Sequence, residues 1–152
     1  MKITLTKKAN RNLLVCARED GTFTKIELGP NLPHHDLAHY VLEKTLGFTD
    51  GFFGSVKKGY SVQELSTKEV ILTLPPQAML AEVLVRALGC IQTGSCTMEG
   101  FEALVQMELS PEQKELLPAL SLELVQTMVK DDEKLLEQWE KLPDNGQLNL
   151  EF

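Results

Sequence analysis

The sequence has little positive charge. It holds 15 Lys and Arg residues against 22 Asp and Glu residues, which gives a formal net charge of −7 over 152 residues. The lysines form only two short clusters, Lys7-Lys8 and Lys57-Lys58, whereas a nucleic-acid-binding protein carries a basic stripe along one face. We interpret both clusters as solvated surface lysines, each able to bind one phosphate at most, and we expect no nucleic-acid partner.

Long apolar runs are also missing. No stretch approaches the roughly 20 apolar residues that a transmembrane helix needs, and residues 1–6 do not begin an apolar stretch of signal-peptide length. The acidic composition further disfavours binding to anionic membranes. Hydrophobic residues make up 43% and charged residues 24% of the sequence, as in an ordinary globular protein. We therefore expect one cytoplasmic domain over residues 1–152, with no membrane partner.

Cysteine is scarce, and its spacing is uninformative. Cys16, Cys90 and Cys96 form an odd set without a Cys-x-x-Cys motif, which excludes a disulfide-dense scaffold. Five residues separate Cys90 from Cys96, more than the two to four between paired ligands of a structural zinc site, so half a zinc site there is a minor alternative. Cys96 as a nucleophile would need a base, and all histidines are far away in the sequence. We expect three reduced thiols.

Alternation of polar and apolar residues predicts strands near both ends of the chain. Asp20-Gly21 lies between two strand-like runs, a pattern typical of a β-hairpin because both residue types tolerate positive φ. A terminal strand would leave its backbone unpaired unless it joined the others, so we expect one antiparallel sheet. The predicted strands are residues 2–6, 12–18 and 22–28, which form a meander, and residues 147–152.

The sequence between these strands predicts helices. Pro33 suits a helix start and Gly47 a helix end, and residues 29–33 are predicted to separate the sheet from this first helix. Residues 70–74 fit either a buried strand or an extended loop. The fold class is therefore α+β, with an antiparallel sheet packed against a layer of helices. We expect helices over about 33–46, 76–89, 98–108 and 119–141, and shorter ones that begin near Thr49, Ser61 and Ser110.

Two of the long helices carry distinct patterns. The helix over 76–89 is apolar nearly all round and is expected in the core. The helix over 119–141 has one apolar stripe, which Asp132 interrupts, so it either docks on the core or forms a dimer contact. The charged run Lys130–Lys134 is interpreted as a solvated face. The stripe consists of Val125, Met128, Leu135, Trp139 and Leu142.

All three histidines lie within six residues on the helix over 33–46. At 100° per residue, His34 points into the middle of the apolar face, so we interpret it as a core histidine. His35 and His39 lie at the border of that face with Asp36 and Glu43, on the edge between core and solvent. The apolar face itself consists of Leu37, Ala38, Val41, Leu42 and Thr45.

His35 and His39 are one turn apart, a spacing that suits two ligands of one metal ion such as zinc. His35-Asp36-x-x-His39 matches the zincin His-Glu-x-x-His spacing with a shorter acid in place of Glu. Glu43 lies about 12 Å along the axis from His35, so it is expected beside the ligands rather than on the same ion. The third ligand is expected to be a carboxylate, a cysteine or water, with Glu64 and Glu69 as candidates. The alternative is that both histidines are structural or surface groups.

The segment from Leu32 to Glu43, read with residues 46–48 and 51–54, resembles a block found in small bacterial proteins of unassigned function. The block reads Leu-Pro-His-His-Asp-Leu-Ala-His-Tyr-Val-Leu-Glu, followed by Leu-Gly-Phe and Gly-Phe-Phe-Gly. The resemblance covers about 25 residues. It implies a bacterial cytoplasmic protein and assigns no catalytic residue.

Three functions remain open from the sequence. The first is divalent-metal or small-ligand binding, with or without hydrolysis, at His35 and His39 with Asp36 and Glu43 beside them. The second is a non-enzymatic interaction or regulatory module that binds a partner through its acidic helical surface and the helix of Trp139. In one version of this hypothesis the partner is a second copy of the chain. The third is a small-molecule pocket walled by Phe52-Phe53, a pair that we also expect to pack against the histidine helix.

Overall fold

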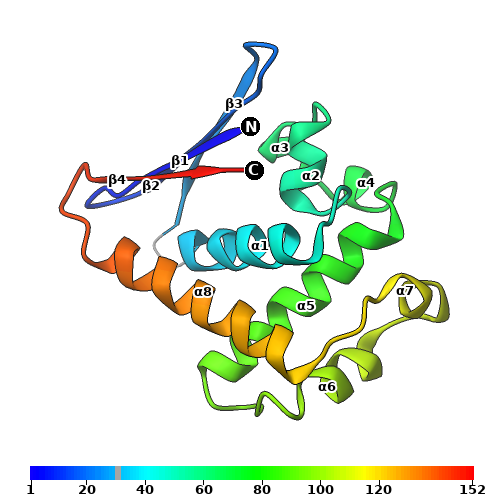
Figure 1. Cartoon of the computed structure of the whole chain (residues 1–152). Coiled ribbons are helices and arrows are strands. Elements are labelled where there is room, and N and C mark those ends of the chain that lie inside the picture. Colours follow the sequence, from blue (N-terminus) through cyan, green and yellow to red (C-terminus); the bar gives the residue numbers. More distant parts are fainter. Residues whose placement is uncertain (30–31) are drawn as a thin grey trace.

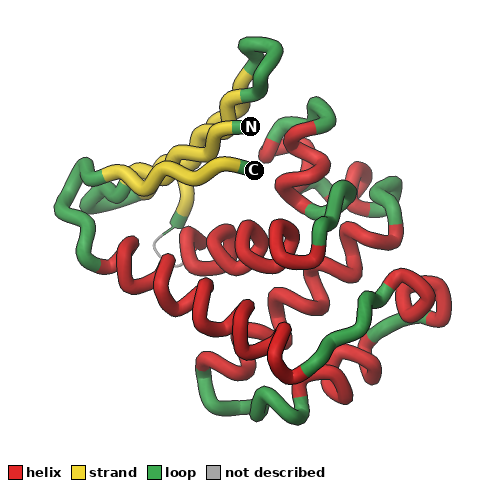
Figure 2. The backbone as a smooth tube through the Cα atoms, viewed as in Figure 1, coloured by secondary structure: helices red, strands yellow, loops and turns green. Residues whose placement is uncertain are grey.

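The computed structural model describes residues 1–29 and 32–152 (Figures 1 and 2). Its sheet has the order β3-β2-β1-β4, and every neighbouring pair is antiparallel. The predicted meander and the predicted pairing of the C-terminal strand with it are therefore confirmed, as is the α+β class. The strands are β1 (Lys2–Thr6), β2 (Asn12–Ala17), β3 (Phe23–Leu28) and β4 (Gln147–Glu151).

Helices fill the chain between β3 and β4. β3 ends at Leu28 and α1 begins at Leu32, although residues 30 and 31 of the predicted break lie outside the described residues. In the described part of the chain, none of the helices combines the length and the apolar character that crossing a bilayer requires. The helices are α1 (Leu32–Leu46), α2 (Phe52–Lys57), α3 (Val62–Leu65), α4 (Lys68–Ile71), α5 (Pro76–Gln92), α6 (Phe101–Glu108), α7 (Pro111–Leu116) and α8 (Leu122–Glu140).

The helices are stacked two deep against one face of the sheet, where a single layer was expected. α1 lies between the sheet and α5 (Figure 1). On its sheet side, Leu37 joins Leu14 of the sheet and Phe53 of α2 in one apolar core. On its other side, Leu42 joins Leu84 of α5 and further residues of α6 and α8 in a second core. Because α1 is covered from both sides, it buries polar residues that would be exposed on a surface helix.

Residues 70–74 form neither a buried strand nor an extended loop, so that prediction is wrong. Lys68–Ile71 is the short helix α4, and a turn follows it. Leu72 is 76% exposed, so the run lacks the burial that a strand of this composition would need. A short apolar run has no periodicity that separates a strand from one turn of helix.

The end of α5 also differs from the expectation. The helix continues through Gly89 to Gln92, and the left-handed residue that follows it is Gly94, with φ of 72°. An interior glycine weakens a helix by roughly 1 kcal/mol, which the packing of a long buried helix overcomes.

α8 docks on the core, as one of the two interpretations of its stripe predicted. Trp139 is buried in the sheet-side core. Asp132, expected within a solvated charged run, is fully buried, and its Oδ2 accepts a hydrogen bond from Nε2 of Gln92. The interpretation of the run as a solvated face is therefore wrong at Asp132, because that position faces the C-terminal end of α5.

Candidate metal centre

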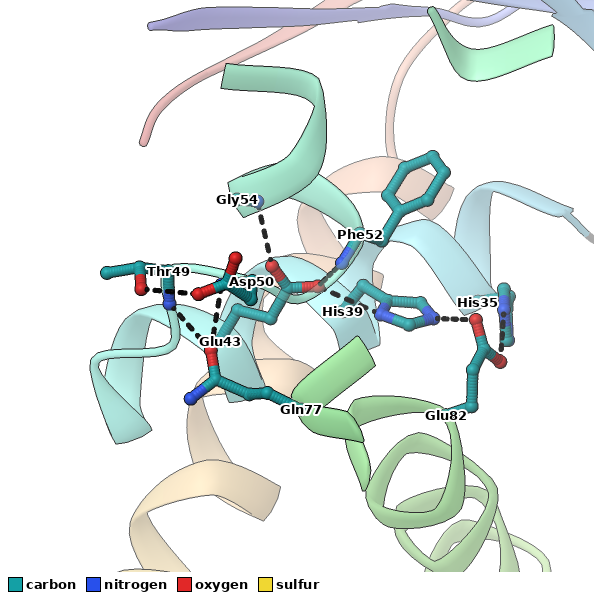
Figure 3. A network of polar contacts seen from close by, with 9 residues as sticks. All are labelled: His35, His39, Glu43, Thr49, Asp50, Phe52, Gly54, Gln77 and Glu82. Carbon is teal, nitrogen blue, oxygen red and sulfur yellow. Dashed lines mark hydrogen bonds and ion pairs between the residues drawn. The ribbon is translucent and has the colours of Figure 1, made fainter. Parts of the chain in front are cut away.

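Two histidines of α1 and one glutamate of α5 come together where these helices cross. His35 and His39 are one turn apart on α1, and Glu82 lies in the middle of α5 (Figure 3). One ligand atom of each residue can be chosen so that all three atoms lie within 4.8 Å of one another. In the part of the chain that the structure describes, this is the one such group of His, Cys, Asp and Glu side chains.

The three side chains point toward one another. Nε2 of His39 lies 3.2 Å from Oε1 of Glu82, and Nε2 of His35 lies 3.7 Å from Oε2 of the same carboxylate. The two imidazole rings meet edge to face, with centroids 4.7 Å apart. Both ring nitrogens therefore face one carboxylate from one side of α1.

A buried carboxylate fixes the ring of His39. Nδ1 of His39 donates a hydrogen bond of 3.1 Å to Oε1 of Glu43, one turn further along α1. Both residues are almost fully buried. The proton on Nδ1 directs Nε2 at Glu82, and the contact of Nε2 with that carboxylate is an ion pair without hydrogen-bond geometry. A carboxylate behind a ligating imidazole is the usual support of a histidine metal ligand.

The first residues of α2 hold Glu43 in place. The backbone N–H groups of Phe52 and Gly54 donate to its two carboxylate oxygens, over 2.7 Å and 3.1 Å. A Cβ atom at Gly51 would overlap the same carboxyl group. Oε1 of Gln77 on α5 accepts from the backbone N–H groups of Thr49 and Asp50. The Gly-Phe-Phe-Gly segment thus packs on the histidine helix, as predicted.

The charges around His39 favour its protonated form when no metal is bound. Burial alone would lower the pKa of His39, but its contacts with the carboxylates of Glu43 and Glu82 outweigh burial and raise it to about 9. Burial and the neighbouring His39 lower the pKa of His35. Burial would raise the pKa of Glu82, yet its contact with His39 holds that pKa below its ordinary value. A metal ion at Nε2 would replace the proton there and meet an ionised carboxylate.

This donor set fits a small divalent ion. Two imidazole nitrogens and one carboxylate form a ligand set of catalytic zinc sites, in which a fourth position stays open. Ligand atoms about 2 Å from a tetrahedral ion lie about 3.3 Å from one another; here the two histidines lie 3.2 Å and 3.7 Å from different oxygens of Glu82, and all three ligand atoms lie within 4.8 Å, so small side-chain shifts would close the set around an ion. The side chains of His35 and Glu82 are 42% and 38% exposed, so one side of the group is open to solvent.

The structure corrects the interpretation of His34. This side chain is exposed, and its Nε2 lies 2.8 Å from Oε1 of Glu140 at the end of α8. A helical wheel gives the direction of a side chain but not what lies opposite. The first turn of α1 faces the end of α8 rather than the core, so His34 forms a surface ion pair.

The predicted band along the edge between core and solvent is also wrong for three of its four residues. His39, Asp36 and Glu43 are buried, and only His35 lies at the edge. Glu43 does lie directly behind His39, which agrees with the prediction that Glu43 lies beside the ligands. Asp36 is not one of the three grouped residues; it is buried within the influence of the charges of His39 and Glu82, and burial raises its pKa to about 7.

The third member of the group was missed by the sequence analysis. Glu64 caps α3 through Ser61, and Glu69 lies on the exposed surface of α4, so neither approaches the histidines. The carboxylate that approaches the histidines is instead that of Glu82. The sequence held one signal for it, because Glu82 is the single acidic residue of the apolar helix α5.

The cysteines do not join this group. Cys16 is buried in the sheet, and burial raises the pKa of its thiol to about 12, which makes it a poor ligand and nucleophile. Cys90 and Cys96 are free thiols at the end of α5 and in the loop after it.

None of the protein-family models, curated proteins or solved structures with which the chain was compared matches it. The resemblance of the histidine block to small bacterial proteins therefore stays a prediction.

Proposed function

We propose that this protein binds one divalent transition-metal ion of the zinc class through Nε2 of His35, Nε2 of His39 and the carboxylate of Glu82. The observation that carries the proposal is the state of His39. Its Nε2 is buried, lies 3.2 Å from Oε1 of Glu82 in an ion pair that lacks hydrogen-bond geometry, and is directed at that carboxylate by the hydrogen bond from Nδ1 to Glu43. A metal ion between the ring nitrogen and the carboxylate would bind both groups in place of the proton.

The proposal extends to ligand binding at the ion. Three protein ligands leave a position for water or for a small molecule, and a zinc ion there supplies Lewis acidity. Glu43 would keep the imidazole of His39 in one tautomer and one orientation. Hydrolysis of the zincin type is not part of the proposal, because the buried Asp36 makes no contact that would place it as a base beside the ion.

Calorimetric titration of zinc, nickel and manganese into chelator-treated protein tests the proposal. One zinc or nickel ion per chain is expected to bind more tightly than manganese, because imidazole favours the first two ions. Glu82→Gln and His35→Ala alter partly exposed side chains and should fold, while weakening zinc binding by about tenfold or more. Zinc affinity should fall as the pH is lowered from about 9, because zinc must displace the proton of His39, and it should fall further below about pH 6, where ordinary imidazoles are also protonated.

Two control variants match these changes. His34→Ala removes the neighbouring histidine of α1, and Glu69→Gln neutralises an exposed glutamate of α4; both should leave zinc binding unchanged. Binding no tighter than about 100 μM in the wild type, about −5.5 kcal/mol, would contradict the proposal. Equal losses in His34→Ala and His35→Ala would contradict the assigned ligands.

A non-enzymatic interaction module is the alternative if no ion binds. Its homodimeric version would not use the stripe of α8, since Trp139 is buried within the chain. Light scattering over the micromolar range separates a dimer from a monomer. A bacterial origin and a cytoplasmic location stay predictions from the sequence.

A further inference from the structure

A pocket of about 300 Å³ adjoins the proposed metal centre. It is enclosed by α3, α4, α5 and the start of α2, and Glu82 forms part of its wall. Phe52 lines the pocket too, and the Phe52 ring also lies against the ring of His39, with centroids 5.5 Å apart. The pocket and the proposed metal centre therefore share the side chain of Glu82, and Phe52 links the pocket to His39, so a molecule in this pocket would lie beside the ion.

The wall of this pocket is apolar except at one end. Leu65, Leu74 and Met79 supply apolar surface, and Met79 remains partly exposed at the rim. The charged residues of the wall are Glu82 and Arg86, one turn apart on α5. Apolar walls with a few converging polar groups are the usual character of small-molecule sites.

Arg86 makes the polar end of the pocket favour an anionic group of a ligand. Glu82 would be occupied by the metal ion, which leaves Arg86 as the group available to a ligand. One of its terminal nitrogens donates to Oε2 of Glu108 over 2.6 Å, and this is its one hydrogen bond within the described residues. A guanidinium has five N–H donors in a fixed fork that suits a carboxylate. The remaining donors, and an open position on the ion, both favour an anionic oxygen.

We propose that the pocket binds a small monocarboxylic acid with an apolar tail. The carboxylate lies at the Glu82–Arg86 end beside the ion, and the tail lies against Leu65, Leu74 and Met79. A volume of about 300 Å³ holds about ten non-hydrogen atoms, since one water molecule takes about 30 Å³ in the liquid. Octanoate has that size. This inference rests on the proposed metal binding, because the ion offsets the negative charge of Glu82.

Calorimetric titration of octanoate into the zinc-loaded protein tests the inference. We expect one octanoate per chain, with much weaker binding of octylamine, which lacks the anion, and of acetate, which lacks the tail. Arg86→Gln should weaken octanoate binding about tenfold and leave zinc binding unchanged. Met79→Gln keeps the side-chain length at a partly exposed position and should weaken octanoate binding about fivefold.

Matched controls lie outside the pocket. Met107→Gln alters an exposed methionine of α6, and Arg11→Gln alters an exposed arginine beside β2; neither should change octanoate binding. If zinc binds and octanoate does not bind tighter than about 1 mM, the inference is wrong while the metal centre stands. Equal binding of octanoate and octylamine, or no effect of Arg86→Gln, would also overturn it. Failure of zinc itself to bind would instead overturn the proposed function.

Discussion

Asp132 is a buried carboxylate whose charge destabilises the folded protein. Burial and the neighbouring Glu133 raise its pKa from 3.8 to about 7, against the opposing hydrogen bond from Gln92. An acid with a raised folded-state pKa binds a proton more tightly when folded than when unfolded. The resulting loss of stability begins as the pH rises above about 4 and is complete above about pH 7.

Asp132→Asn should therefore stabilise the protein at neutral pH. An amide oxygen can still accept from Gln92, and no charge is buried. The gain in unfolding free energy should grow from pH 4 to pH 7 and reach at most about 4 kcal/mol. Urea denaturation of both proteins at several pH values measures it. A gain that does not depend on pH would show that Asp132 is not titrating in this range.

Gly51 links the α1–α2 turn to the proposed metal centre. A Cβ atom there would overlap the carboxyl group of Glu43, which holds His39. Gly51→Ala should cost about 1–3 kcal/mol of stability and weaken zinc binding about tenfold or more, as loss of a group supporting a ligand does. Gly89→Ala is the control, because nothing lies within 4 Å of its added Cβ; it should stabilise α5 and leave zinc binding unchanged. Unchanged zinc affinity in Gly51→Ala would show that Glu43 does not support the proposed zinc ligand His39.

Among the helices and strands, those with a local signature were predictable from the sequence. Asp20-Gly21 marked the hairpin, Gly21 indeed has φ of 85°, and Ser61 with Glu64 forms the capping box that begins α3. α4 had no such signature, because four residues of apolar sequence fit a strand as well as one turn of helix. The end of α5 was misplaced since Gly89 resembles a helix stop, although packing keeps it helical.

The two aromatic residues at the start of α2 have different roles. Phe53 is fully buried in the core beneath the sheet, whereas Phe52 is partly exposed between His39 and the pocket. Phe53→Ala should destabilise the protein by about 3–5 kcal/mol, and Phe52→Ala should cost clearly less. Thermal and chemical unfolding of both variants compares them. A larger loss of stability in Phe52→Ala than in Phe53→Ala would contradict the assignment of Phe53 as the buried ring.

For the protein as a whole, the proposed metal centre joins the two helix layers. His35 and His39 belong to α1, which lies under the sheet, and Glu82 belongs to α5 in the layer below (Figure 1). The sequence predicted the two histidines because their spacing is local to one helix. It could not predict Glu82, because the crossing of α1 and α5 brings together residues more than 40 positions apart. It also placed Glu43 and His39 at an edge, since nothing local shows that α1 is covered on both sides.

Zinc should stabilise the folded chain if the centre forms only when α1 and α5 are packed together. A free zinc concentration of 100 times Kd should raise the unfolding free energy by about 2.7 kcal/mol. Calorimetric melting with and without zinc measures this, and Glu82→Gln should lose most of the gain. A gain of the same size in Glu82→Gln would place the bound ion elsewhere.

The sharpest test of the metal centre is anomalous X-ray diffraction from crystals grown with one zinc ion per chain, recorded on both sides of the zinc absorption edge. We expect one strong peak between Nε2 of His35, Nε2 of His39 and the carboxylate of Glu82, about 2.0–2.2 Å from each ligand atom. A peak beside Cys90 and Cys96, or no ordered peak in a protein that keeps this fold, would contradict the proposed centre.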